Sequence, residues 1–201
     1  MPDTLSQQLR TKRISRIHFQ GDSITQGCGF VAQQDNYVEH LRLQMQKLAE
    51  EHVLRVYNHA VGGATAADGL QRIHWCERER HLPQLTFIMF GLNDVHQNVP
   101  IDAYQNGLES MARRLLDLES QVVILSPTPF PARAADLQDF ADRARQVADQ
   151  CGTSFVDCLS PFYPSGRLTP DTLWADGVHL TTAGHQILGQ TIADTLLEAG
   201  N

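Results

Sequence analysis

The chain has 201 residues, of which 42% are hydrophobic, and this length falls within the usual range of one domain with a single core. Lysine and arginine number 16 against 23 aspartate and glutamate residues, so the formal net charge of -7 leaves no excess of cations for a nucleic-acid backbone. The longest apolar runs are far below the roughly 20 residues of a membrane span, and residues 1–16 are polar without an apolar signal segment, which favours a soluble, cytoplasmic protein.

Short apolar runs alternate with amphipathic stretches along the whole chain. Apolar runs bounded by turn residues predict strands, and apolar residues at helical spacing predict helices. The predicted elements are, in order, a strand over 14–20, a helix over 37–51, a strand over 53–58, a helix over 64–76, a strand over 85–90, a helix over 101–118, a strand over 122–125, a helix over 133–150, a strand over 154–156, and a helix capped by Thr181-Thr182 that runs to 197. This alternation predicts one open α/β sheet with helices on both faces, in a single domain over 1–201 whose residues 1–13 form a polar N-terminal extension.

Four short motifs follow one another along this pattern: Gly21-Asp22-Ser23, Gly62-Gly63, Gly91-Leu92-Asn93-Asp94 and Asp176-Gly177-Val178-His179. Each of the first three directly follows a predicted strand, and the fourth precedes the last predicted helix. Active sites of open α/β sheets collect beyond the carboxyl ends of the strands. We therefore expect these motifs to meet at one edge of the sheet.

Ser23, His179 and Asp176 are the residue types of a nucleophilic hydrolase. A serine hydroxyl is nearly inert at neutral pH and needs a base within hydrogen-bond reach. Asp176 stands three residues before His179, a spacing that in a helical turn brings side chains within roughly 5 to 6 Å, and Gly177 lets the backbone bend between them. Asp176 could then hold the ring tautomer while Nε2 takes the serine proton. The structural alternatives are a turn that caps a helix at Ser23 and a capping Asp beside an incidental His.

The glycine doublet and Asn93 are candidate donors to a developing oxyanion. Gly62 or Gly63 precedes a predicted helix, where backbone N–H groups lack partners, and Asn93 offers side-chain N–H groups after an apolar strand. The alternative for the doublet is a tight turn between strand and helix. For Asn93 the alternative is a turn-forming Asn-Asp, and Asp94 is expected to be structural.

Together the four motifs resemble those of the SGNH hydrolase family, also called the GDSL esterases and lipases, over residues 17–197. The resemblance implies a flavodoxin-like, three-layer α/β/α sandwich with a five-stranded parallel sheet. It implies that the catalytic residues are Ser23, Asp176 and His179. It also implies that the oxyanion-hole donors are Ser23, Gly63 and Asn93. Because the two glycines are adjacent, the motif does not decide which of them is the donor, so Gly62 is the alternative donor.

The implied reaction is two-step hydrolysis of a small carboxylic ester, carrying a short acyl or O-acetyl group, through an acyl-enzyme and without metal or cofactor. A carbohydrate O-acetylesterase or a thioesterase on the same site is the nearest alternative. Asp22, Phe130 and Trp174 are candidate substrate contacts, and Phe30, Phe162 and Tyr163 add aromatic character to the loops that shape the pocket. The sequence carries no signal for an oligomeric state.

Two alternative functions, from other classes of protein, remain. A metal-dependent phosphoesterase would use as ligands Asp22, Asn93, Asp94, Asp176 and His179, although two-metal sites need more converging ligands than these motifs provide. A non-catalytic binding module on the same fold is the other alternative. The four cysteines (Cys28, Cys76, Cys151 and Cys158) have neither the short paired spacing of a zinc site nor the density of a disulfide scaffold, so we expect reduced thiols.

Overall fold

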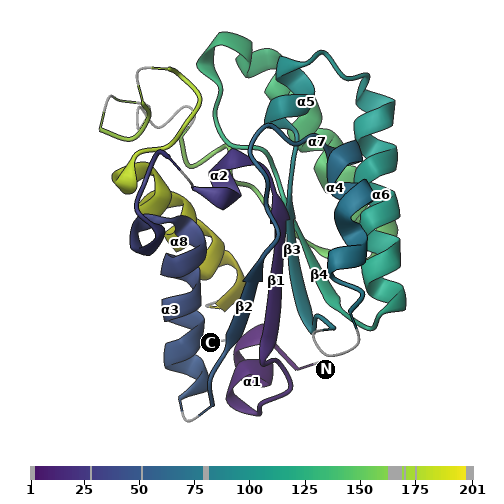
Figure 1. Ribbon diagram of the computed structural model, residues 1–201, viewed down its shortest axis with the longest axis vertical. Helices are drawn as coiled ribbons and strands as arrows, with labels where there is room; N and C mark the ends of the chain where they lie inside the picture. The colour runs from purple at the N-terminus through teal and green to yellow at the C-terminus, as the bar shows by residue number, and fades with distance from the viewer. Residues whose placement is uncertain are drawn as a thin grey trace.

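Five parallel strands form the central sheet of the protein, in the order β2-β1-β3-β4-β5 (Figure 1). The computed structural model describes residues 3–27, 29–50, 52–78, 82–162, 169, 171–174 and 176–197. The strands are β1 (Arg16–Gly21), β2 (Arg55–Asn58), β3 (Leu85–Met89), β4 (Gln121–Leu125) and β5 (Ser154–Val156).

Helices cover both faces of this sheet (Figure 1). One face carries α1 (Leu5–Arg10), α3 (Tyr37–Ala49) and α8 (Thr182–Leu197), and the other carries α4 (Ala66–Arg72), α6 (Ile101–Asp117) and α7 (Ala134–Cys151). Shorter helical turns join the elements: α2 (Ser23–Gln26), η1 (Gln33–Asp35), η2 (Ile73–Trp75), α5 (Leu92–His96) and η4 (Pro131–Arg133). The expected three-layer α/β/α sandwich with a five-stranded parallel sheet is confirmed.

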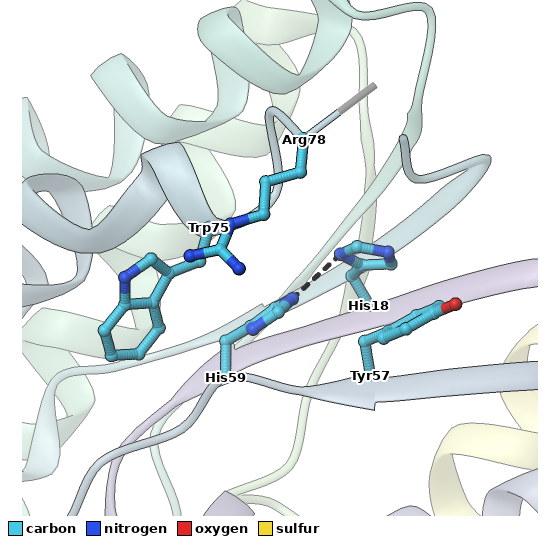
Figure 2. A pocket seen from close by; sticks show the side chains of 5 residues that line it. All are labelled: His18, Tyr57, His59, Trp75 and Arg78. Atoms are coloured by element: carbon cyan, nitrogen blue, oxygen red, sulfur yellow. Dashed lines mark hydrogen bonds between the residues drawn. The ribbon is translucent and has the colours of Figure 1, made fainter. Parts of the chain in front are cut away.

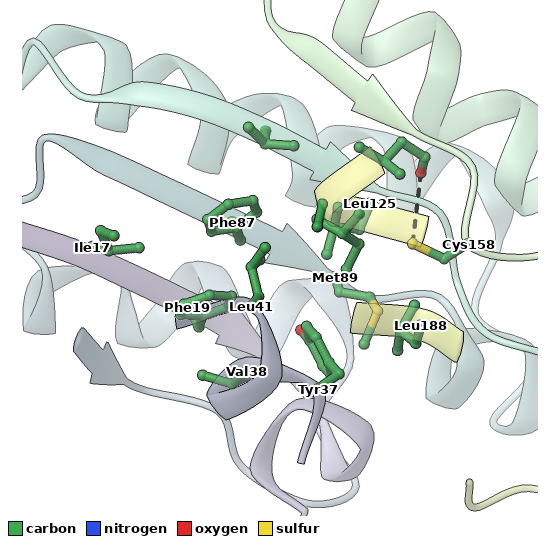
Figure 3. Close-up of a cluster of buried hydrophobic side chains, with 14 of the residues drawn as sticks. Ile17, Phe19, Tyr37, Val38, Leu41, Phe87, Met89, Leu125, Cys158 and Leu188 are labelled. Carbon is green, nitrogen blue, oxygen red and sulfur yellow. Dashed lines mark hydrogen bonds between the residues drawn. The ribbon is translucent and has the colours of Figure 1, made fainter. Parts of the chain in front are cut away.

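The sheet separates two hydrophobic clusters because successive side chains of a strand point to opposite faces. On β1, Ile17 and Phe19 pack toward α3 and α8, whereas His18 and Gln20 point to the opposite face. Figure 3 shows the first cluster, in which the ring of Phe19 stacks on that of Phe87 with centroids 4.7 Å apart. Every residue of β3 is buried, as expected of a strand covered on both sides.

Each strand and helix expected from the sequence is present, with ends that differ by a few residues. The helix expected over 64–76 is divided into α4 and the tighter turn η2, a common way for a helix to end. Thr181 caps α8 as predicted, because its Oγ1 accepts a hydrogen bond from the Gly184 N–H. None of the helices in the described ranges combines the length and the apolar character that crossing a bilayer requires.

The expectation of a polar extension over residues 1–13 was wrong for the segment that forms α1. Thr4 and Gln7 form a reciprocal capping box at its start, and Leu9 is fully buried against the cluster of α3 and α8. The Ser6 hydroxyl also donates to the Leu197 carbonyl, 2.6 Å away. A helix of six residues contributes one buried side chain, too few to produce a periodic signal in the sequence.

Candidate active site

The strand order places a topological switch beside β1, the strand that lies between β2 and β3. In open parallel sheets, ligands bind in the crevice outside the carboxyl ends of the strands at such a switch. Ser23 begins α2 directly after β1, Gly62 and Gly63 lie in the loop after β2, and Asn93 lies in α5 just after β3. The first three motifs therefore share one edge of the sheet, as the sequence predicts.

His179 bridges Ser23 and Asp176 through two hydrogen bonds. Its Nε2 lies 2.9 Å from the Ser23 Oγ, although the two residues are 156 positions apart in the chain. Its Nδ1 lies 2.9 Å from the Asp176 Oδ2. In this arrangement the imidazole can accept the serine proton at one nitrogen while the carboxylate holds the proton on the other.

Asp176 and His179 meet through a side-chain turn and not through the helical turn that their spacing suggested. The Asp176 Oδ1 accepts the backbone N–H groups of Val178 and His179, at 2.9 and 3.0 Å, which leaves Oδ2 for the ring. Gly177 adopts a positive φ of 71°, which accounts for glycine at the bend. Partial burial alone would raise the pKa of Asp176, but the hydrogen bonds from His179 and Val178 hold it below its ordinary value. Asp176 is therefore a carboxylate at neutral pH.

The ring of Phe30 stacks on the imidazole of His179, with centroids 3.4 Å apart and planes 7° apart. This contact covers one face of the imidazole and restricts its rotation. Phe30 was expected only as one of several aromatic residues in the loops.

The short helix α2 fixes the backbone around Ser23. Asn36 donates to the Ile24 carbonyl at 3.2 Å, and Asn58 donates to the Thr25 carbonyl at 2.8 Å, so residues from two other elements hold its orphan carbonyls. The Thr25 hydroxyl also lies 2.9 Å from the Tyr37 hydroxyl. The sequence analysis missed these anchors, because side-chain bonds between distant segments leave no spacing signal.

Asp22 is the N-cap of α2 and is only 2% exposed, so the structure does not support the expectation that it contacts substrate. Its Oδ1 accepts the Ile24 N–H at 3.0 Å. Burial raises the pKa of Asp22 to about 7, with a smaller contribution from the nearby Asp94. The carboxyl group is therefore protonated in the folded protein at mildly acidic pH.

This burial predicts how Asp22→Asn changes the pH dependence of stability. The folded-state pKa is above the unfolded value, so the protonated Asp22 contributes stability that is lost as pH rises from about 4 through about 7. Asparagine resembles the neutral form and does not titrate. We expect the stability advantage of the variant over wild type to grow by on the order of 2 kcal/mol between pH 5 and pH 8, measured by urea unfolding.

The exposed Asp149→Asn is the control for this measurement and should follow the wild-type curve. Asp94, whose pKa burial raises to about 6, and His185, whose pKa burial lowers to about 3, titrate in all three proteins, so the difference between the curves reports on Asp22. Parallel pH profiles of Asp22→Asn and wild type would show that Asp22 is ionised in the folded state.

The two glycines of the doublet differ in the use of their N–H groups. The Gly62 N–H donates to the Gln26 Oε1 at 2.8 Å. Gly63 has a φ of 77° within a turn closed by the Ala64 N–H and the Val61 carbonyl, a conformation that favours glycine. Within the described ranges, the Gly63 N–H has no recorded acceptor. Of the two glycines, Gly63 is therefore the one whose N–H is available to donate a hydrogen bond.

Asn93 and Asp94 tie the start of α5 to the loop after β2. The Asn93 Nδ2 donates to the Ala64 carbonyl at 3.1 Å, and an amide nitrogen carries a second hydrogen. Both Asp94 carboxyl oxygens lie within 3.2 Å of the Ala66 nitrogen. Asp94 is fully buried, which agrees with its expected structural role.

The aromatic residues expected near the pocket have different surroundings. Trp174 is 46% exposed, and its backbone N–H donates to the His179 carbonyl, which places it beside the Asp176–His179 turn. Phe130 is half-buried in the loop after β4, with its ring 6.1 Å from that of His96. Phe162 is 1% exposed and belongs to the core, so its expected place in the pocket was wrong. Tyr163 lies outside the described residues.

The ligand set imagined for a phosphoesterase does not assemble as one. Asp22 and Asp94 accept backbone N–H groups, whereas Asp176 pairs with His179. Among the residues that the structure describes, these side chains do not form a group of three with metal-ligand spacing. Cys76, Cys151 and Cys158 are free thiols, and Cys28 lies outside the described residues.

Comparison with known proteins agrees with this geometry. The family model described as the GDSL-like lipase/acylhydrolase family matches residues 19–187. A GDSL esterase/lipase of Arabidopsis thaliana is 23% identical over 146 residues, which cover 59% of this chain, and the match spans about 60% of the length of that relative.

Two solved structures are similar in fold. An acetylxylan esterase from Geobacillus stearothermophilus has a TM-score of 0.76 and 24% identity, covering 90% of this chain and 94% of that one. A lipase/acylhydrolase from Enterococcus faecalis has a TM-score of 0.75 and 24% identity, covering 92% and 97%. With the family model matching most of its length, the chain belongs to the GDSL-like lipase/acylhydrolase family, a family of ester hydrolases.

Proposed function

We propose that this protein is a serine esterase that hydrolyses a small carboxylic ester through a Ser23-His179-Asp176 triad. The observation that carries the proposal is the chain of two 2.9 Å hydrogen bonds from the Ser23 Oγ through the imidazole to the Asp176 carboxylate. The family supports ester hydrolysis as the reaction class.

In the first step the Ser23 Oγ attacks the acyl carbon while its proton moves to the His179 Nε2. The C=O electron pair moves onto the carbonyl oxygen, and its return expels the alkoxide leaving group, which takes the proton from Nε2. Water then attacks the acyl-enzyme by the same route, which releases the acid and restores the serine. Asp176 keeps the proton on Nδ1 and stabilises the imidazolium in both steps.

The donors proposed for the oxyanion are the N–H groups of Ser23 and Gly63 and the side-chain amide of Asn93. Ser23 is the first residue of α2, so its N–H has no acceptor within that helix. Gln26 already engages the Gly62 N–H, which favours Gly63 as the donor from the doublet. Asn93 keeps one hydrogen after its bond to Ala64.

Asn93→Ala tests the oxyanion hole. We expect kcat to fall by about 10²- to 10³-fold with KM little changed, because one donor to the developing charge is lost. Steady-state kinetics on p-nitrophenyl acetate measure both values. Gln97→Ala removes a different bond to the same loop, to the Gly63 carbonyl, and should change kcat by less than about 10-fold. An effect of Asn93→Ala on KM alone would assign Asn93 to substrate binding.

For the substrate we propose a short acyl or O-acetyl ester, with Trp174 and Phe130 as contacts. The exposed Trp174 beside the Asp176–His179 turn supports this assignment, since an aromatic ring packs on either a sugar face or an alkyl chain. The fold relative from Geobacillus is named for acetylated xylan, so an O-acetyl sugar enters the comparison.

A substrate panel distinguishes these esters. It consists of p-nitrophenyl esters of increasing chain length, acetylated xylose and an acyl-CoA. We expect kcat/KM to be highest for the shortest acyl groups. Preference for acetylated xylose or for the thioester would assign the site to the corresponding alternative. Activity that resists a fluorophosphonate but disappears with a chelator would reject the serine mechanism.

A further inference from the structure

A cavity of about 340 Å³ lies away from the Ser23 site and is lined by His18, Tyr57, His59, Trp75 and Arg78 (Figure 2). His18 points to the face of the sheet opposite Ile17 and Phe19, under the turn formed by η2. It precedes Ser23 by five residues, or about 16 Å along an extended strand. The cavity is therefore separate from the proposed esterase site.

Three ligand-type side chains converge beside this cavity: His18 of β1 and His59 just after β2, which line it, and the fully buried Cys76 just after η2. One ligand atom from each lies within 4.8 Å of the other two. Around a tetrahedral zinc ion, bonds of about 2.0 to 2.3 Å place neighbouring ligand atoms about 3.3 to 3.8 Å apart. Movements of about 1 Å would bring the three side chains to that spacing.

The two histidines of this cluster contact each other through ring nitrogens. The His59 Nε2 lies 3.0 Å from the His18 Nδ1, as Figure 2 shows, so one ring donates its N–H to the other. Burial, with the charge of Arg78, lowers the pKa of His59 below its ordinary value, so the ring is neutral at pH 7. For both of these nitrogens to bind a metal ion, the shared hydrogen would move to the other nitrogen of the same ring.

Cys76 has a partner suited to a thiolate. The Gln20 Nε2 donates to its Sγ at 3.1 Å, and both side chains are at most 1% exposed. Hydrogen bonds to a ligand sulfur orient it and stabilise its charge. Burial raises the pKa of Cys76 to about 11, so the free group is a thiol that must release a proton when it binds a metal.

We propose that His18, His59 and Cys76 form a three-ligand zinc site whose fourth position faces the cavity. Two imidazoles and one thiolate are a ligand set that zinc accepts, and three protein ligands leave one position for water. The bound ion would join β1, the end of β2 and η2, and so fasten the turn after α4 to the edge of the sheet. Binding forms two N–Zn bonds and one S–Zn bond and releases one proton, from Cys76.

Cobalt and zinc titrations of the metal-free, full-length protein test this site. We expect one equivalent of Co²⁺ to give the d–d bands of a tetrahedral site and thiolate-to-cobalt charge-transfer absorption, and Zn²⁺ to remove both. Calorimetry in two buffers of different ionisation enthalpy should give about one proton released per Zn²⁺. The absence of a thiolate band in the wild type would overturn the proposal.

Four variants locate the ion. Cys76→Ser should abolish the thiolate band, whereas Cys151→Ser, at another free thiol, should retain it. His59 is half-buried, so His59→Gln can replace Cys76→Ser in the test if the latter does not fold. We expect His59→Gln to lower the affinity for Zn²⁺ by roughly 100-fold or more. Arg78→Gln should tighten Zn²⁺ binding by removing a facing positive charge. A thiolate band that persists in Cys76→Ser, or weaker binding in Arg78→Gln, would contradict the site.

Discussion

Ser23→Ala is expected to lower kcat on p-nitrophenyl acetate by about 10⁴- to 10⁶-fold, because the variant lacks the hydroxyl that is proposed to form the acyl-enzyme. The side chain is small, and its Oγ makes one recorded contact, to the His179 Nε2. The fold should therefore survive, and KM should change little. Stopped-flow and steady-state kinetics measure the loss, and thermal unfolding checks the structure.

The matched control is Ser154→Ala, at an exposed position of β5, which should keep wild-type turnover. A fluorophosphonate should add one mass increment to the wild type, on the peptide that contains Ser23, and none to Ser23→Ala. Wild-type turnover in folded Ser23→Ala, or the label on another residue, would exclude Ser23 as the nucleophile.

The layers of the fold were predictable because each strand carries its own signal. The five residues of β3 are all buried and apolar or β-branched, and α6 places Tyr104, Leu108 and Met111 on one face at helical spacing. The strand order β2-β1-β3-β4-β5 was not among the expectations from the sequence. Which strands pair with one another depends on how the connecting segments pack, and the local hydrophobic periodicity of the sequence does not predict this.

The meeting of Ser23 and His179 was predictable because the order of elements brings distant residues to one edge of the sheet. Ser23 follows β1, and His179 precedes α8, which packs beside α3. How Asp176 reaches the ring was not predictable, because a three-residue spacing fits both a helical turn and a side-chain turn. Only the structure distinguishes the Gly62 N–H, engaged by Gln26, from that of Gly63.

The His18, His59 and Cys76 cluster shows what spacing alone misses. These residues come from a strand, the end of a second strand and a helical turn, with 41 positions between the two histidines. Zinc motifs are recognised in sequences from closely spaced pairs of ligands. Here the parallel pairing of β1 with β2, in which His18 is opposite Tyr57, places His59 beside His18, and the turn after η2 adds Cys76.

His179→Ala is expected to reduce kcat about as much as Ser23→Ala, by about 10⁴- to 10⁶-fold, because without a base the hydroxyl stays protonated. The double variant Ser23→Ala/His179→Ala should be no slower than either single one, since the two act as a unit and the residual rate comes from the oxyanion donors. Kinetics on p-nitrophenyl acetate measure all three. The exposed His74→Ala is the control and should keep wild-type turnover.

Chemical rescue separates loss of the base from loss of structure. Removing the His179 side chain opens a space bounded by the Phe30 ring on one side, the Ser23 hydroxyl on another and the Asp176 carboxylate on a third. Free imidazole can enter it and meet the same two hydrogen-bond partners. We expect added imidazole to restore part of the turnover of His179→Ala and none of that of the double variant. Additive losses in the double variant, or equal rescue of both proteins, would mean that Ser23 and His179 do not share one proton transfer.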